Sequence, residues 1–537
     1  MLRYVHALTL FSFISVSFAA SADQWQDRSI YQLLTDRFAV RNNAGAPCNT
    51  TARTLCGGSW IGITEHLDYI QNMGFDAIWI SPVVENIDDK NPYGEAYHGY
   101  WTKNISNLNP HFGKPDDLKT LSSAVHARGM YIMVDVVVNH FAGVPFHPEA
   151  NISSIDDFNL SGLSPFSSPS EFHPFCWIQD YSNQTQTEQC WLGDNNLALI
   201  DLDTENPNVV TTMNTWISSL VKDYNIDGIR IDTVRHVRKD FWPDFVKAAG
   251  VFSIGEIYDR NVSFVKDYTE VMDSVLDYPT YFALTAAFSS TQGSLSELLD
   301  VATASQKSYK RGVFGTGSFL ENHDVPRFQS ITGDWALVKN AITWSFVTDG
   351  IPILYSGQEQ GYQGAADPNN REALWLSGYA TANKTLVTLV KTLNSARKSA
   401  ITLNSSFLTT PMTFIPQGGN QAIAISKLPI LTLLTNVGQS GTATWNVPGV
   451  FEPKQALVDV LTCNQFIVPS NGNMTVSSND GLPKVLMPST VADQVCDHGE
   501  QDIAKKRRHG NKAPLANKAE WETFGITLFF LFSGWFF

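Results

Sequence analysis

Two patterns of apolar residues alternate along the chain from about residue 29 to residue 357. Short β-branched and aromatic runs predict strands, and between them Leu and Ile recur at helical spacing, as in 64–74 and 116–129, which both end at glycine. The predicted strands span residues 29–38, 77–83, 131–140, 228–232, 251–257, 271–278, 317–324 and 350–359. Eight strands alternating with helices predict an α/β fold, a closed parallel (β/α)8 or TIM barrel. An open doubly wound sheet is the alternative, although no G-x-G-x-x-G motif follows the first strand.

Two segments depart from this rhythm. Residues 141–200, after the third strand, are rich in Ser, Pro and Asn and are too long for an ordinary βα loop. They predict a small inserted domain B, which divides the barrel into residues 21–140 and 201–402. From about residue 403 the pattern changes to short alternating strands separated by Gly, Pro and Asn turns. Residues 403–496 are therefore predicted to form a C-terminal antiparallel β-sandwich domain.

Both ends of the chain have the pattern of targeting signals. Arg3 precedes an apolar stretch over 7–18 and small residues at 19–22, which predicts a secretory signal peptide over residues 1–20. Residues 497–537 combine a polar basic stalk, small residues at Gly510, Asn511 and Ala513, and an apolar tail over 523–537. This order is typical of a GPI-attachment signal. A tail-anchored membrane helix is the alternative, but a bilayer span needs about 17 residues or more.

Composition narrows the class of protein. The chain of 537 residues is 43% hydrophobic and 17% charged, as expected of a globular protein. Its net charge of −15 disfavours nucleic acid as a partner. Aromatic residues make up 12% of the chain, which favours either a well-packed core or a cleft in which ring faces stack on sugars. We expect a monomer that meets a membrane only through its lipid anchor.

Secretion determines how the cysteines and sequons are interpreted. The six cysteines fall into close pairs, Cys48/Cys56, Cys176/Cys190 and Cys463/Cys496. Three local disulfides are the natural arrangement in an oxidising compartment, although the sequence alone allows other connectivities. Nine Asn-x-Ser/Thr sequons predict N-glycosylation, at Asn49, Asn104, Asn151, Asn159, Asn183, Asn261, Asn383, Asn404 and Asn473.

Polar side chains follow several of the predicted strands. The third strand ends in Asp135, Asn139 and His140, the fourth in Arg230 and Asp232, the fifth in Glu256, and the seventh in His323 and Asp324. In a (β/α)8 barrel, reactive groups gather at these carboxyl ends of the strands. Any one of these residues alone is more often structural than catalytic. Several strand-end carboxylates beside His and Arg together predict an active site.

The chemistry that fits these residues is cleavage of a glycosidic bond, which requires one protonated and one ionised carboxyl group. Asp232 suits the ionised role because the neighbouring Arg230 stabilises a carboxylate. Glu256 suits the acid role because its run, VFSIGEIY, is apolar. Asp324 with His323 would hold sugar hydroxyls. His98, His140 and His323 would act as neutral donors, and the alternative for each is a satisfied core histidine.

With these residues identified, the sequence resembles the α-amylase family of glycoside hydrolases, most closely the fungal secreted α-amylases. The segments DVVVNH (135–140), GIRIDTVRH (228–236), GEIY (255–258) and FLENHDVPRF (319–328) resemble the four motifs of that family in order and spacing. YGEAYHGYW (93–101) and DPNNREALWLSGY (367–379) resemble two further segments that line its substrate cleft. The similarity runs from about residue 25 to residue 496.

The resemblance implies roles for individual residues. Asp232 matches the nucleophile, Glu256 the general acid/base and Asp324 the transition-state stabiliser of a retaining mechanism. Arg230 would hold the nucleophile. The expected substrate contacts are Tyr93 as a stacking platform, together with His98, Tyr100, Trp101, His140, Arg235, His323, Asp367 and Arg371. The three cysteine pairs match disulfides of the family, and a further pair found in secreted fungal relatives is missing.

A structural calcium ion between the barrel and the inserted domain is also implied by the resemblance. Asn139 and Asp201 match side-chain ligands, Glu188 matches a further ligand position, and His236 would bind through its backbone carbonyl. A set of carboxylate, amide and carbonyl oxygens suits Ca²⁺. The alternative is that these are ordinary polar residues of a domain interface.

Two departures from the secreted relatives bear on function. Arg235 stands where they typically have lysine, and a guanidinium offers a different donor geometry on the acceptor side. The GPI signal resembles a surface-anchored fungal subgroup associated with cell-wall α-glucan, some members of which transfer glucan chains. We therefore expect retaining endo-hydrolysis of α-1,4-glucosidic bonds in starch, glycogen and maltooligosaccharides, with a cell-surface 4-α-glucanotransferase as the alternative. A non-catalytic glucan-binding protein is disfavoured because no catalytic carboxylate is missing.

Overall fold

The computed structural model describes residues 20–496, except 44, 144, 148–150 and 493–494. The predicted tail and nearly all of the predicted signal peptide lie outside these residues. Within the part of the chain that is described, none of the helices combines the length and the apolarity required to cross a bilayer.

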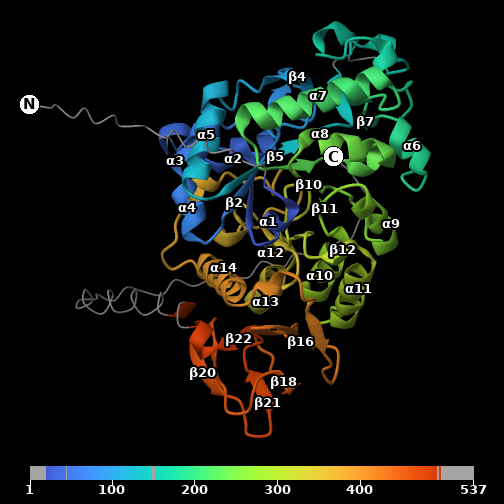
Figure 1. The fold of residues 1–537 in the computed structure, drawn as a ribbon. Coiled ribbons are helices and arrows are strands. Elements are labelled where there is room, and N and C mark those ends of the chain that lie inside the picture. The colour runs from blue at the N-terminus through green and yellow to red at the C-terminus, as the bar shows by residue number, and fades with distance from the viewer. Residues whose placement is uncertain (1–19, 44, 144, 148–150, 493–494, 497–537) are drawn as a thin grey trace, which may run out of the picture.

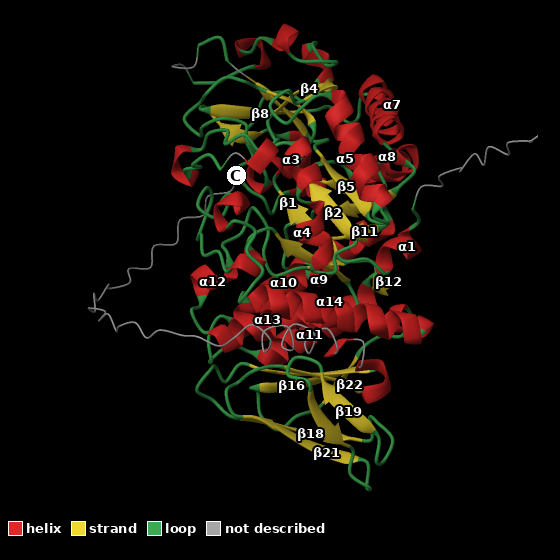
Figure 2. Ribbon diagram, turned by 90° about the vertical axis from the view of Figure 1, so that its left-hand side faces the viewer, coloured by secondary structure: helices red, strands yellow, loops and turns green. Residues whose placement is uncertain are grey.

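Eight parallel strands form the barrel at the centre of the molecule (Figure 2). They are β1 (Ile30–Leu33), β2 (Ala77–Ile80), β5 (Tyr131–Val136), β9 (Gly228–Ile231), β10 (Phe252–Gly255), β11 (Ser274–Val275), β13 (Gly317–Ser318) and β14 (Ile351–Tyr355). The hydrogen-bonded order is β11-β10-β9-β5-β2-β1-β14-β13, and a parallel bridge between Leu276 and Gly317 joins the two ends. Each strand falls within a predicted range, so the predicted barrel is confirmed.

Side chains along the barrel strands alternate between two cores. One set packs under the surrounding helices, including Ile78, Ile80, Ile132, Val134, Ile229 and Ile231. The other set fills the barrel, including Ile30, Ala77, Trp79, Met133, Phe252, Ile254, Ile351 and Ile353. Because the side-chain period of a strand is two, Gln32, Asp135 and Glu256 continue this inward set. Arg230, between Ile229 and Ile231, points inward by the same alternation.

Helices surround the barrel (Figure 2). They are α1 (Ala22–Gln26), α2 (Thr35–Phe38), α3 (Trp60–Glu65), α4 (Leu67–Asn72), α5 (Pro115–Ala127), α7 (Pro207–Tyr224), α8 (Trp242–Ala249), α9 (Val262–Lys266), α10 (Tyr278–Phe288), α11 (Leu295–Ser308), α12 (Phe328–Ile331), α13 (Trp335–Val347) and α14 (Thr385–Leu403). The single helix predicted over 64–74 is instead divided at His66, where φ is −118°. The His66 ring also hydrogen-bonds the carbonyl of Gly62, which competes with regular helix continuation.

The segment after β5 forms its own small antiparallel sheet. Its strands are β6 (His140–Gly143), β7 (Leu192–Asp194) and β8 (Leu197–Asp201), in the order β6-β8-β7. Helix α6 (Gln184–Gln189) lies in the same segment, and the Cys176–Cys190 disulfide ties its end to the preceding loop. A second ribbon, β3 (Val84–Asn86) with β4 (Thr102–Leu108), follows β2 and was not predicted from the sequence.

The C-terminal domain lies beneath α13 and α14 (Figure 1). A six-stranded sheet has the order β15-β16-β17-β22-β19-β20, and β18 pairs with β21. The strands are β15 (Thr413–Ile415), β16 (Ala422–Lys427), β17 (Ile430–Thr435), β18 (Ala443–Pro448), β19 (Ala456–Asp459), β20 (Asn464–Ile467), β21 (Asn473–Ser478) and β22 (Lys484–Pro488). The remaining short strand, β12 (Lys310–Val313), belongs to the barrel region and not to this domain. Trp445, Leu431 and Leu486 form a core between the two sheets, which confirms the predicted sandwich.

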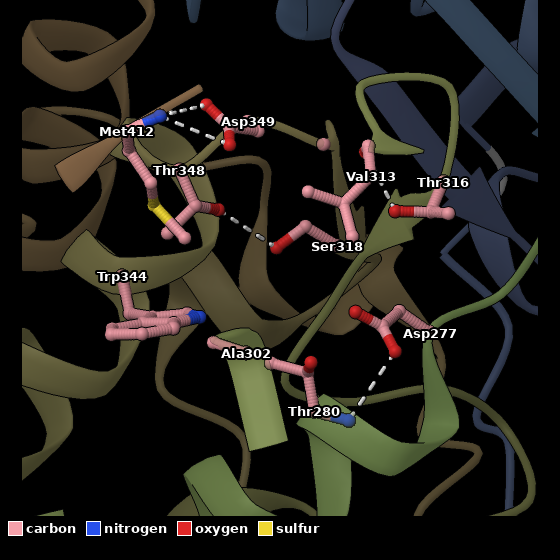
Figure 3. Close-up of a pocket in the computed structure, with 11 residues that line it drawn as sticks. Asp277, Thr280, Ala302, Val313, Thr316, Ser318, Trp344, Thr348, Asp349 and Met412 are labelled. Atoms are coloured by element: carbon pink, nitrogen blue, oxygen red, sulfur yellow. Dashed lines mark hydrogen bonds between the residues drawn. The ribbon is translucent and has the colours of Figure 1, made fainter. Parts of the chain in front are cut away.

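A buried ion pair lies where the barrel meets the C-terminal domain. Lys427 Nζ is 2.6 Å from Asp349 Oδ1, and Asp349 also accepts the backbone N–H of Met412 (Figure 3). The cavity beside it, lined by Thr316 and Thr348 among others, has a volume of ≈ 20 Å³. This is room for about one water molecule, so the cavity is a feature of the interface and not a substrate site.

Three disulfides form at the positions predicted. They join Cys48 to Cys56, Cys176 to Cys190 and Cys463 to Cys496. The third spans the strands β20 to β22 and ties the end of the described chain to the C-terminal domain.

Candidate active site

The centre of the site is the guanidinium of Arg230, which is 1% exposed. Strands β5, β9 and β10 are neighbours, so Asp135 and Arg230 are paired in register and Glu256 follows β10 on the same inward face. Arg230 Nη1 lies 2.9 Å from Asp135 Oδ1 and 2.8 Å from Asp232 Oδ1, and Nη2 lies 2.9 Å from Glu256 Oε2. One cation thus holds three carboxylates at the carboxyl end of the barrel.

Burial sets different proton affinities on the two central carboxyl groups. Desolvation raises the pKa of Asp232 to about 6 and that of Glu256 to about 7, and in both cases Arg230 opposes the rise. The expectation that Arg230 favours the ionised form is correct in sign, but burial outweighs it at Asp232. With both pKa values raised, the pair can hold one proton near neutral pH, which suits a site that needs one protonated and one ionised carboxyl group.

Thr233 contacts both of these carboxyl groups. Its backbone N–H donates to Glu256 Oε2 at 3.0 Å and its hydroxyl donates to Asp232 Oδ2 at 3.1 Å. The residue has φ of +46°, a left-handed conformation that is strained for a β-branched side chain. On the other side, the Tyr278 hydroxyl donates to Glu256 Oε1 at 3.3 Å. The strain at Thr233 is therefore associated with holding the two carboxyl groups in place.

Asp324 forms the opposite wall and is the most exposed of the three predicted catalytic carboxylates, with a side-chain exposure of 26%. His323 Nε2 lies 3.1 Å from Asp324 Oδ2, and Arg371 Nη2 lies 3.3 Å from Asp324 Oδ1. Arg371 is held in turn by Asp367 at 2.9 Å. Burial raises the pKa of Asp324, and Arg371 and Arg230 oppose that rise.

The predicted histidines are buried and their pKa values are lowered by desolvation, to about 4 for His140. They therefore serve as neutral rings. The backbone N–H of Tyr100 donates to His98 Nδ1, which places the ring proton of His98 on Nε2. His140 Nε2 contacts the Tyr100 carbonyl, and His323 Nδ1 contacts the side-chain amide of Gln32.

Tyr100 is the aromatic ring at the carboxylates. Its hydroxyl donates to Asp135 Oδ2 at 2.7 Å, and its ring stacks on His323 with centroids 5.1 Å apart. Trp101 packs edge-on against His98. Tyr93, expected to be the stacking platform, donates its hydroxyl to Asp194 of the inserted segment. Of these two tyrosines, Tyr100 is the one hydrogen-bonded to Asp135 beside Arg230.

Arg235 is held from several sides. Its Nη2 donates to the carbonyl of Tyr181 at 2.9 Å, and its Nη1 lies 3.3 Å from Asp259 Oδ2 and 3.4 Å from the carbonyl of Tyr258. The guanidinium also lies over the Phe264 ring. These contacts join the inserted segment to the loop after β10, two residues beyond Glu256.

Two of the predicted calcium ligands, Asn139 and Asp201, have buried oxygens of the kind that a hard cation could satisfy. Asn139 and Asp201 are each 1% exposed and adjacent across the β6–β8 pairing, and the Oδ1 atom of each has no hydrogen-bond partner among the described residues. A buried oxygen without a partner is costly unless a cation or water satisfies it. Glu188 accepts a hydrogen bond from Gln184, which also donates to the carbonyl of Arg235, next to His236. The donor set is all oxygen, as Ca²⁺ prefers.

A second group of possible metal ligands, His173, Asp203 and Glu205, lies next to this site. His173 Nδ1 is 2.6 Å from Asp201 Oδ2 and its Nε2 is 2.8 Å from Glu205 Oε2. Burial alone would lower the pKa of His173, but the two carboxylates outweigh burial and raise it to about 10. His173 thus links the buried Asp201 to Glu205 through its two ring nitrogens.

A parallel barrel with closely spaced carboxyl groups at its carboxyl end is the arrangement expected of a glycoside hydrolase. Residues 32–401 match the family model of the alpha amylase catalytic domain, and residues 417–503 match that of alpha-amylase domain C.

The chain is 43% identical over 478 residues to alpha-amylase 2 of Schwanniomyces occidentalis, covering 88% of this chain and 92% of that one. It is 45% identical over 484 residues to alpha-amylase 1 of Lipomyces kononenkoae, covering 89% and 76%. The structure of an alpha-amylase from Malbranchea cinnamomea is similar with a TM-score of 0.83 at 40% identity, covering 88% and 98%. The chain belongs to the α-amylase family of glycoside hydrolases.

Proposed function

We propose that the protein is an α-amylase that cleaves α-1,4-glucosidic bonds within starch- or glycogen-type α-glucans and maltooligosaccharides with retention of configuration. The observation that carries this is the Arg230 guanidinium, which contacts Asp232 and Glu256 at the same time. Two carboxyl groups held by neighbouring nitrogens of one guanidinium favour the separation of about 5–5.5 Å of retaining enzymes over the wider spacing of inverting ones.

In the first step the Asp232 carboxylate attacks the anomeric carbon, and the Glu256 carboxyl group gives its proton to the departing glycosidic oxygen. The product is a glycosyl ester on Asp232. In the second step Glu256, now ionised, takes a proton from water, which attacks the same carbon and releases Asp232. Asp324, with His323 and Arg371, holds sugar hydroxyls on the opposite wall, and Tyr100 supplies the ring face at the cleavage point.

The test uses the secreted chain and maltoheptaose. Wild type should produce shorter maltooligosaccharides whose new reducing ends first appear as the α-anomer by NMR. Asp232→Ala should have no measurable activity although it folds, as judged by its thermal transition. Intact activity in Asp232→Ala, or a β-anomer as first product, contradicts the mechanism.

The alternative is a 4-α-glucanotransferase, in which a sugar hydroxyl replaces water in the second step. The observation that favours it is the fixed guanidinium of Arg235, which joins Tyr181 to Asp259 on the side of the proton donor. Side chains held in fixed positions on that side would favour the binding of a sugar acceptor over water. Early products longer than maltoheptaose would establish transfer, and Arg235→Lys should then lower their share.

We further propose that Ca²⁺ binds to Asn139, Glu188, Asp201 and the backbone carbonyl of His236. When bound, the ion supplies positive charge to two buried oxygens that lack partners and so links the inserted segment to the barrel. The disulfides and sequons support secretion, and residues 497–537 support attachment by a GPI anchor. Release of activity from intact cells by a phosphatidylinositol-specific phospholipase C tests the anchor.

A further inference from the structure

A groove with a volume of ≈ 460 Å³ is lined by residues of α7 and β4, two elements that lie at the outside of the barrel (Figure 1). We name it the α7 groove, and it is lined by residues 105–108 and 165 on one side and by α7 residues between 211 and 224 on the other. None of the candidate catalytic or cleft residues belongs to its lining. Its volume lies within the roughly 300–1,000 Å³ typical of ligand sites.

Two aromatic rings of α7 form part of the wall. Trp216 and Tyr224 line the groove, and both are only partly buried. They are eight residues apart on one helix, which separates them by about 12 Å along its axis. A short ligand would meet one of these rings, whereas an extended chain of similar units would meet both.

The rest of the lining combines hydroxyl side chains and one amide with apolar residues, and it is almost uncharged. The Thr215 hydroxyl donates to the carbonyl of Thr211, so its lone pairs remain available to accept hydrogen bonds from a ligand. Ser219 and Asn107 are exposed in the same lining. Asp223 is the one charged residue of the lining, and Lys119 Nζ lies over the Tyr224 ring at 5.9 Å from its centroid. The groove therefore lacks the cluster of bases that binds phosphorylated or acidic ligands. Aromatic faces beside neutral donors and acceptors match the apolar C–H faces and hydroxyl rims of sugars.

We propose that the α7 groove is a second α-glucan-binding site, in which Trp216 and Tyr224 stack on sugar units of a polysaccharide whose other segments reach the active site. The inference rests on the proposed function for its substrate class. A second contact on the same polymer raises the effective concentration of chain near the carboxylates. It therefore acts on long glucans and not on oligosaccharides that fill the active site alone.

The experiment measures binding and turnover separately. Binding is followed by electrophoretic retardation in gels containing glycogen, in an Asp232→Asn background that does not degrade the gel. Trp216→Ala should raise the apparent dissociation constant for glycogen about three- to tenfold, the range expected for loss of one stacking contact. Because Trp216 also packs on the core, Ser219→Arg serves as a second variant that blocks the groove from an exposed position. Both changes, in the otherwise wild-type chain, should leave kcat/KM on maltoheptaose unchanged.

The outcomes separate this proposal from the proposed function. Unchanged glycogen affinity in both variants overturns the groove site, while maltoheptaose cleavage by wild type still supports the active site. Failure of wild type to cleave maltoheptaose contradicts the function itself. Asn104 carries a sequon beside the groove, so Asn104→Gln is tested in parallel. Glycogen binding that appears only after removal of this glycan overturns the proposal, because the chain's own glycan would then occupy the groove.

Discussion

Asp135 lies beneath the active site, and its replacement by Asn tests whether Arg230 depends on a third carboxylate. Four hydrogen bonds reach Asp135, two from Arg230 at 2.9 and 3.1 Å, one from the Tyr100 hydroxyl at 2.7 Å and one from Trp79 Nε1 at 3.1 Å. Asparagine keeps the shape but offers one carbonyl oxygen and an NH2 group, so at least one buried N–H donor loses its acceptor. Each such loss costs about 1–3 kcal/mol of the free energy of unfolding. Asp232 and Glu256 still neutralise Arg230, which keeps the cost below the roughly 3–5 kcal/mol of an uncompensated buried charge.

Activity should change in a diagnostic way. The charge of Asp135 contributes to the raised pKa of Asp232, so Asp135→Asn lowers that pKa, and the acid limb of the kcat/KM profile should move to lower pH. The kcat should fall by about 10²-fold, because Arg230 and Tyr100 lose a common anchor and small displacements at reacting groups are costly. Asp349→Asn is the matched control, since it breaks a buried ion pair at the C-terminal domain and should destabilise without moving the pH profile. An unchanged acid limb together with a kcat within about twofold of wild type refutes the reasoning.

Three other predictions follow from the pKa values and the calcium ligands. The pH dependence of kcat/KM should be bell-shaped, with activity lost below about pH 6 as Asp232 takes a proton and above about pH 7 as Glu256 loses its proton. The variant Glu256→Gln should lack the alkaline limb of this profile, and its kcat should be lower by about 10²–10⁴-fold. The raised pKa of Glu256 favours the folded state below its ordinary value of 4.5, and this contribution is lost as pH rises towards about 7. Urea titrations should therefore show wild type losing more stability than Glu256→Gln between pH 4.5 and 7, and equal losses would refute this. Chelation of calcium should lower the thermal midpoint of unfolding. If the ion had been present at 100 times its Kd, the free energy of unfolding should fall by about 3 kcal/mol. In Asp201→Asn the midpoint should no longer respond to the chelator.

The sequence was sufficient for the barrel and for the disulfides. Eight apolar runs separated by helical periodicity allow few other closed folds, and every barrel strand lies inside a predicted range. The cysteines are close in sequence, so their pairing needed no knowledge of the tertiary structure. The strand-end position also identified Asp232 and Glu256, because carboxyl ends of barrel strands meet at one face.

Contacts that depend on strand register could not be predicted. Asp135 was recognised as a strand-end residue, but its link to Arg230 requires the β5–β9 register. Gln32 reaches His323 from 291 positions away, because β1 and the end of β13 approach the same axis. The left-handed backbone of Thr233 could not be predicted, because threonine rarely adopts a positive φ. Tyr93 and Tyr100 occupy one motif, and only the fold shows which ring lies beside the carboxylates.

A series of contacts connects the inserted segment to the predicted catalytic carboxylates. Asp201 pairs with His140 across β6 and β8, and the His140 ring contacts the carbonyl of Tyr100. The Tyr100 hydroxyl in turn donates to Asp135, which holds Arg230. The His140–Tyr100 contact is 3.2 Å, and the Tyr100–Asp135 and Arg230–Asp135 hydrogen bonds are 2.7 and 2.9 Å, so a displacement of β8 is expected to reach Arg230. Asp201→Asn should therefore lower kcat as well as stability, although Asp201 makes no hydrogen bond to any of the three predicted catalytic carboxylates.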